Sequence, residues 1–243
     1  MSEKMRGLVL RETNLNEADK ILTVLTHEKG KISVLCKNVR RIKSRFAAGA
    51  HFLCYSDFVI DPGRNMYFLR QCEPCETFYK ISEDIEKLAL ATYLGQLTAE
   101  IVPDETDSDQ ALSMLLNTFY VLCNAEKDLR LVKAVYELRL MSDQGFTPAV
   151  LGCEACGEKL FPMEFDAEKG CIYCAMHKNG KGFPLSEDGL NAIYYILFSP
   201  LKKLFSFTLS KELTQNLASL AEYYVLYRTD KPLKSLEYLK SLW

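Results

Sequence analysis

The sequence predicts an α+β protein in which strands come first and helices follow. Three observations support this. Short β-branched runs separated by tight turns fill the first eighty residues, apolar positions then recur at helical spacing, and two C-x2-C pairs interrupt the helical part. With 243 residues, of which 48% are hydrophobic, the chain can form one large domain or two to three small ones.

The N-terminal strands are recognised from their alternation and from the turns between them. Strand-like runs occupy residues 8–10, 21–26, 32–36, 52–60 and 66–69. Gly30 and Asp61-Pro62-Gly63 supply tight turns between consecutive runs. Five short strands in this length predict a closed barrel of the OB type, with another small barrel as the alternative.

After Tyr79 the pattern changes to a helical one. Ser82 is expected to cap the first helix, and residues 107–110 resemble a capping box for the second. Later helices are expected at 128–142, which is apolar on most faces, after Ser186, and over 210–228. The apolar positions of the C-terminal tail indicate that it docks on the helical body.

Four cysteines form the strongest motif of the chain: Cys153, Cys156, Cys171 and Cys174. Each C-x2-C pair can present two sulfurs to one ion from a tight turn, and four thiolates complete a closed tetrahedral shell. We therefore predict one structural Zn²⁺, with four free thiols as the alternative. His177, separated from Cys174 by two residues, is a fifth candidate ligand, although a solvent-facing position on its Lys/Gly-rich loop is preferred for it.

These patterns predict three regions. An OB-fold nucleic-acid-binding domain spans 1–79, and an α-helical domain spans 80–150 and 183–243. The zinc-binding segment, 151–182, is inserted into the helical domain.

Positive charge is concentrated near the N-terminus. Residues 1–60 carry eleven bases and six acids, a net charge of +5, whereas the other 183 residues sum to −7. The chain as a whole has a net charge of only −2. Such asymmetry indicates that the basic part meets a polyanion.

The most basic stretch lies between the third and fourth predicted strands, where it would form a flexible loop on the barrel. Such a loop can neutralise phosphates without reading sequence, and the alternative is an ordinary solvated charge run. The candidate DNA-binding residues are Lys37, Arg40, Arg41, Lys43 and Arg45 in this loop, with Arg6 and Lys31 extending the patch.

No catalytic residues are expected. The sequence contains no G-x-x-x-x-G-K-[ST], G-x-S-x-G or H-E-x-x-H motif, and its three histidines lie in no recognisable catalytic setting. An enzymatic alternative is a thiol oxidoreductase using Cys72 and Cys75, but redox pairs usually open a helix in a βαβ setting. A further alternative, a zinc-bearing transcription factor, predicts sequence-specific duplex binding.

Composition also indicates a compartment. No apolar run reaches the ~18 residues of a membrane span, and the N-terminus lacks the core of a signal peptide, so no membrane contact is expected. Nine cysteines together with a zinc motif indicate a reducing cytoplasm rather than a disulfide framework. We expect a cytoplasmic, nucleoid-associated protein.

Several segments, taken in order, resemble the RecO family of bacterial recombination mediators. They are Leu8-Val9-Leu10, Asp19-Lys20 before Ile21-Leu22-Thr23, Gly30-Lys31, Ser44-Arg45-Phe46, Tyr136-Glu137-Leu138-Arg139-Leu140, Gly145-Phe146-Thr147-Pro148, Cys153/Cys156/Gly157 and Pro232-Leu233-Lys234-Ser235-Leu236. The resemblance extends over nearly the whole chain. His177 and the Cys72/Cys75 pair depart from the pattern expected of the family.

The resemblance implies a non-catalytic DNA repair protein. It would bind single- and double-stranded DNA, anneal complementary strands and contact the C-terminal tail of the single-strand binding protein SSB. With RecR it would help to load RecA onto SSB-coated DNA. The SSB tail requires an apolar pocket rimmed by basic side chains, for which Arg130 and Lys133 are candidates.

Overall fold

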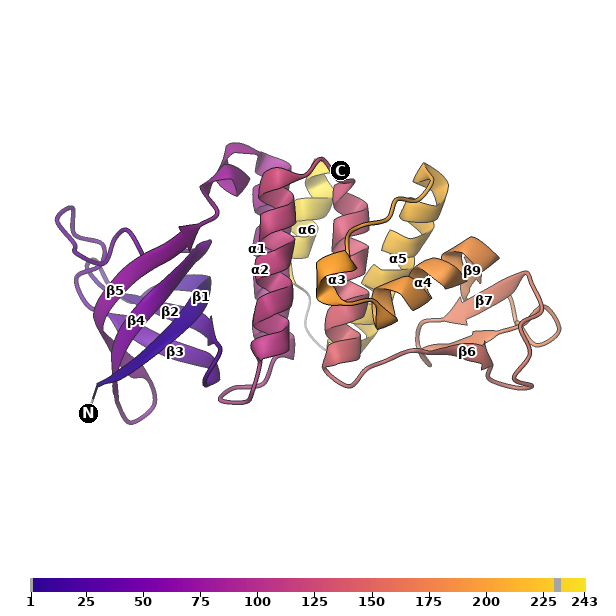
Figure 1. Cartoon of the computed structure of the whole chain (residues 1–243), viewed down its shortest axis with the longest axis horizontal. Coiled ribbons are helices and arrows are strands. Elements are labelled where there is room, and N and C mark those ends of the chain that lie inside the picture. The colour runs from indigo at the N-terminus through magenta and orange to yellow at the C-terminus, as the bar shows by residue number, and fades with distance from the viewer. Residues whose placement is uncertain (1, 230–232) are drawn as a thin grey trace. The chain divides into compact units, whose positions relative to one another are not determined.

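The computed structural model describes residues 2–229 and 233–243 (Figure 1). Its contacts divide the chain into two compact units, Met1–Ala125 with Leu233–Trp243, and Glu126–Pro232. Pro232, part of the C-terminal signature, lies outside the described residues. The three-region division made from the sequence stays a prediction.

The first unit begins with a five-stranded barrel. Its strands are β1 (Glu3–Asn14), β2 (Lys20–Thr26), β3 (Gly30–Cys36), β4 (Cys54–Pro62) and β5 (Tyr67–Thr77). They close in the order β1-β2-β3-β5-β4, and β4 pairs with β1. Every neighbouring pair is antiparallel except β3 and β5, which are parallel. This closed barrel confirms the predicted fold class.

Alternation along the strands builds the barrel core. In β3, Ile32, Val34 and Cys36 are buried, and the residues between them are more exposed. Val39 and Phe46, from the connection between β3 and β4, belong to the same core cluster. This connection is therefore packed into the barrel at two points, which fixes the place of the basic residues between them.

Helices complete the first unit: η1 (Tyr79–Glu83), α1 (Ile85–Ile101), α2 (Asp109–Asn124) and α6 (Lys234–Leu242). The expected cap at Ser82 is wrong, because that residue lies in η1. Asp84 caps α1 instead, and its carboxylate accepts hydrogen bonds from the N–H groups of Glu86 and Lys87 at 2.9 and 3.1 Å. As expected of the tail, α6 packs on a helix, α1.

The second unit combines helices with a small sheet. Its elements are α3 (Leu129–Asp143), β6 (Ala149–Cys153), β7 (Met163–Asp166), β8 (Cys171–Tyr173), β9 (Phe183–Leu185), α4 (Glu187–Phe198), η2 (Leu201–Lys203) and α5 (Lys211–Arg228). The sheet order is β6-β8-β7-β9. The sequence did not predict these strands, because runs of three to five residues carry too few alternations to be recognised.

The expected burial of α3 is confirmed, since nearly all of its central residues are buried. Lys133 of this helix is only 1% exposed, and its Nζ lies 2.7 Å from Glu137 and 3.0 Å from Glu222. It therefore cannot form the rim of a surface pocket. None of the helices described is both long and apolar enough to span a membrane.

Candidate functional site

Two tight turns carry the metal-type side chains. Cys153 ends β6, and its carbonyl accepts a hydrogen bond from the N–H of Gly157 at 2.7 Å. Gly157 has a φ of 78°, which glycine adopts without steric cost. The second turn follows β8, where the carbonyl of Cys174 accepts from the N–H groups of His177 and Lys178 at 3.0 and 2.9 Å. Each turn thus projects two side chains, three residues apart, from one short loop.

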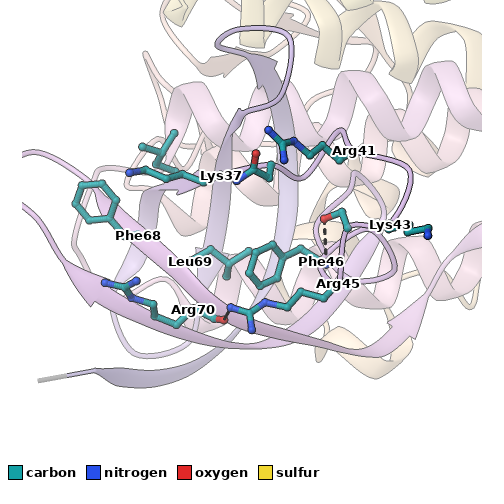
Figure 2. A pocket seen from close by; sticks show the side chains of 11 residues that line it. Lys37, Arg41, Lys43, Arg45, Phe46, Phe68, Leu69 and Arg70 are labelled. Atoms are coloured by element: carbon teal, nitrogen blue, oxygen red, sulfur yellow. Dashed lines mark hydrogen bonds between the residues drawn. The ribbon is translucent and has the colours of Figure 1, made fainter.

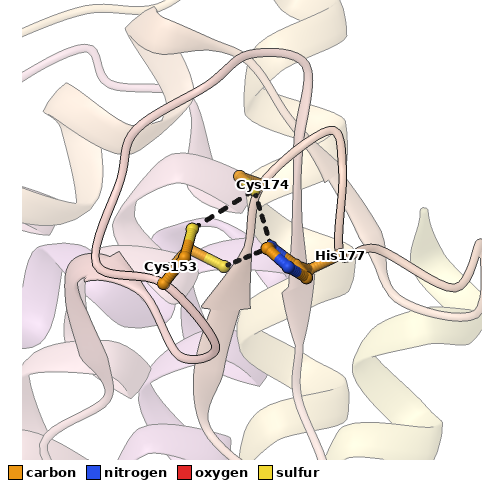
Figure 3. A group of neighbouring side chains, drawn as sticks. Cys153, Cys174 and His177 are labelled. Atoms are coloured by element: carbon orange, nitrogen blue, oxygen red, sulfur yellow. Dashed lines mark hydrogen bonds between the residues drawn. The ribbon is translucent and has the colours of Figure 1, made fainter.

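The two turns bring Cys153, Cys156, Cys174 and His177 together, with one ligand atom of each within 4.8 Å of the others. Figure 3 shows Cys153, Cys174 and His177 of this cluster. The Sγ atoms of Cys156 and Cys174 are 3.8 Å apart. Nδ1 of His177 lies 3.7 Å from Cys153 Sγ and 3.2 Å from Cys174 Sγ. A tetrahedral zinc with Zn–S bonds of about 2.3 Å separates its sulfurs by about 3.8 Å. The donor set and its spacing fit a four-coordinate structural zinc.

The structure differs from the prediction in the fourth member of this cluster. Cys171 lies outside it, because Cys171 opens β8 and side chains alternate between the two faces of a strand. Cys174 directly follows that strand, so a separation of three residues places the two thiols on opposite faces. His177 is exposed, as expected for its loop, but its ring faces the cysteines instead of solvent alone.

Backbone N–H groups favour the thiolate of Cys153. Burial raises the pKa of this thiol, but hydrogen bonds from the N–H groups of Cys174, Ala155 and Cys156 outweigh burial and lower the pKa to about 6. The thiolate is the form of cysteine that binds metals. The local backbone is therefore suited to holding a cation at this cluster.

The predicted basic loop lines a pocket of about 670 Å³ together with β5. Figure 2 shows five cations of this pocket around Phe46 and Leu69: Lys37, Arg41, Lys43, Arg45 and Arg70. The sequence did not predict Arg70 in this pocket, because Arg70 lies far along the chain and comes near the loop through the pairing of β3 with β5. The only signal in the sequence was that Arg70 directly follows the strand-like run 66–69.

Hydrogen bonds hold this loop in place, although a flexible loop was expected. Nη1 of Arg40 donates to the carbonyl of Asn16 at 2.6 Å, and Nη2 of Arg45 donates to the carbonyl of Arg70 at 3.0 Å. Arg40 does not line the pocket, so its guanidinium stabilises the loop and does not contribute to the pocket wall. The other loop cations are exposed on a fixed framework.

Arg6 and Lys31 lie outside the basic pocket. Arg6 donates two hydrogen bonds to Asp57, at 2.6 and 3.0 Å. The ammonium of Lys31 contacts the carbonyl of Ala99 and lies 3.3 Å from the carboxylate of Asp104. Because both charges already have acidic partners, they are less available to phosphate than the loop cations. Their contact with DNA stays a prediction.

Neither Cys72 nor Cys75 has the lowered pKa that is typical of a catalytic thiol. Burial in the barrel raises the pKa of Cys72 to about 12. Cys75 is exposed, yet desolvation and the neighbouring Asp57 raise its pKa as well. Catalytic thiols have lowered pKa values, because the thiolate is the nucleophile.

We accordingly expect slow alkylation of Cys72 and Cys75 by iodoacetamide at pH 7. Their raised pKa values leave little thiolate there, so the rate at Cys75 should climb with pH beyond pH 9, and Cys72 should lag behind it. Mass spectrometry of timed samples, with glutathione as the reference thiol, measures both rates. A cysteine at 72 or 75 that reacts faster than glutathione at pH 7 would favour the oxidoreductase alternative.

An OB-type barrel with a basic pocket, joined to helices and to a Cys3His cluster, defines a class of DNA-binding protein. Comparison with known families identifies which one. The family described as Recombination protein O N terminal matches residues 1–78, and Recombination protein O C terminal matches residues 82–237. This chain therefore belongs to the RecO family, as its resemblance indicated, and has a role in DNA repair and recombination.

Individual relatives agree with the family assignment. The DNA repair protein RecO of Acetivibrio thermocellus is 34% identical over 242 residues, which cover 98% of this chain and 96% of the relative. The proteins of that name from Caldicellulosiruptor bescii and Alkaliphilus metalliredigens are 30% and 28% identical. Each alignment covers 98% of this chain, and 97% and 99% of those two relatives respectively.

Proposed function

We propose that this chain is a recombination mediator that binds single- and double-stranded DNA through the basic pocket of its barrel. It anneals complementary strands and, with RecR, promotes the loading of RecA onto SSB-coated DNA. It acts in the cytoplasm, at the nucleoid, as a binding protein without catalytic activity. The observation that carries this proposal is the gathering of five cations from two separate chain segments around one pocket on an OB-type barrel.

The chemistry of the pocket favours phosphate over base edges. Lysine and arginine neutralise phosphates in a sequence-independent way, and no helix is placed here to read a groove. Apolar surface accompanies the cations: half-buried Phe68 lies beneath Lys37, whose Nζ is 5.9 Å from the ring centroid. A base can stack on such a face whatever its identity. Recognition that ignores sequence is what the annealing of any two complementary strands requires.

The metal has a structural part in this proposal. One Zn²⁺ would be held by Cys153, Cys156, Cys174 and His177, and it would fasten the end of β6 to the loop after β8. Four protein ligands leave no open position for water or substrate. The site therefore supports the fold of the second unit, and DNA binding by the barrel needs no chemistry from it.

We also propose that the chain contacts the SSB tail, but we assign this contact to no particular surface. Lys133 is unsuitable because it is buried between two carboxylates. Arg130, in the first turn of α3, remains a candidate for the basic rim of a tail-binding pocket.

We expect the protein to accelerate annealing of complementary strands that SSB already covers. The measurement is a fluorescence energy-transfer time course with one dye on each strand, with and without the protein. Non-complementary strands provide the control for simple aggregation. A time course unchanged by the protein would contradict the proposed mediator function. Binding that depends on duplex sequence would favour the transcription-factor alternative.

A further inference from the structure

Ile42 has the most exposed large apolar side chain in the part of the chain that the structure describes. Its relative exposure is 104%, whereas the next most exposed, Met176, reaches 77%. A side chain that is fully in water contributes no packing to the fold. Stability of the barrel therefore does not explain why an isoleucine occupies the middle of a run of cations.

A β-turn places Ile42 at the tip of the basic loop. The N–H of Ser44 donates to the carbonyl of Arg41 at 2.9 Å, which makes Ile42 and Lys43 the two corner residues. The N–H of Arg41 in turn donates to the carbonyl of Asn38 at 3.2 Å. Turn corners ordinarily hold polar residues, glycine or proline, so an isoleucine there is unusual.

The two residues beside Ile42 in the chain are positively charged. Both of them, Arg41 and Lys43, line the basic pocket (Figure 2). Ile42 is not among the lining residues of this pocket. Phe46, a few residues further along the loop, is buried in the barrel core. This packing holds the turn that carries Ile42 in place. An apolar tip flanked by phosphate-binding cations is the arrangement by which several DNA-binding proteins press a side chain between two base pairs.

We propose that Ile42 is an apolar wedge that inserts between stacked bases of DNA held at the basic pocket. The wedge rests on the proposed DNA site and adds what phosphate contacts alone do not provide, the unstacking of a base step. Insertion removes the isoleucine from water, which offsets part of the cost of unstacking. A base that has left the stack is also more accessible for pairing with another strand.

A duplex that carries 2-aminopurine in place of adenine at several positions tests the wedge, because its fluorescence rises when a base leaves the stack. With the full chain at low salt and saturating protein, we expect a rise for the parent and for Ile42→Leu. Ile42→Ser should lose this rise while keeping the salt dependence of binding, since its phosphate contacts are intact. Ile85→Ser is the matched control, because Ile85 is 55% exposed but lies at the start of α1.

Two results would overturn the wedge. One is an undiminished fluorescence rise with Ile42→Ser, which would assign this side chain to another contact, such as a protein partner. The other is a parent chain that binds duplex with a clear salt dependence yet leaves 2-aminopurine stacked. If the proposed DNA site is wrong, the result is different: the parent chain would show no salt-dependent binding of DNA. In that case the wedge proposal would be wrong as well.

Discussion

Replacement of Cys174 by serine is expected to abolish stoichiometric zinc binding and to leave little folded protein. Its Sγ lies 3.8 Å from that of Cys156 and 3.2 Å from Nδ1 of His177. It is therefore next to a candidate ligand atom from each of the two turns. Zinc binding is coupled to folding in such sites, with apparent free energies of about 10–16 kcal/mol in zinc-finger peptides. Elemental analysis and a thermal melt of the purified variant measure the two effects.

Two companion variants identify the fourth ligand. His177→Ala should lower the zinc content, because the shell loses its only nitrogen donor. Cys171→Ala should keep one zinc per chain, since this thiol lies on the other face of β8, and it serves as the control for removing a buried cysteine. Loss of zinc in Cys171→Ala with full zinc in His177→Ala would contradict the Cys3His set and favour the four-cysteine set.

The barrel could be predicted from the sequence because its strands and turns are each indicated by a few consecutive residues. Alternation in β3 marks a strand with one buried face, and Gly30 supplies the positive φ, 61°, of the turn before it. The parallel pairing of β3 with β5 has no local signal, and Arg70 reaches the basic pocket only through that pairing. The loop part of the candidate DNA site was therefore predicted from the sequence, and Arg70 of β5 was not.

The structure brings a different fourth side chain into the metal cluster from the one that the motif predicts. Spacing alone favours Cys171 with Cys174, because both belong to a C-x2-C pair. In the structure Cys171 belongs to a strand and Cys174 begins a turn. A strand of only three residues is too short to be recognised from the sequence, so this difference between the two cysteines could not be predicted. The same turn carries His177 back to the cluster. Secondary structure within the segment, and not cysteine count, therefore determines which side chains come together in the structure.

Replacement of Arg41 and Lys43 together by alanine is expected to weaken DNA binding mainly by flattening its salt dependence. Both residues are exposed and line the basic pocket, whereas the Arg40 guanidinium is engaged with the carbonyl of Asn16. Each phosphate contact contributes roughly 0.7 to 0.9 to the slope of log K against log salt, so the slope should fall by roughly one to two units. Zinc content and melting temperature should be unchanged, because neither side chain is buried.

The matched control for this double variant removes two lysines elsewhere. Lys202 and Lys203 of η2 are exposed, and their replacement by alanine changes the net charge by the same amount. If long-range attraction alone holds the DNA, both double variants should shift affinity alike; if the pocket holds it, only the loop variant should change the slope. Arg40→Ala should change the slope less than either Arg41→Ala or Lys43→Ala. Should the loop variant bind and anneal like the parent across the salt series, the loop is only a charged surface, and the DNA site must be sought among the helices.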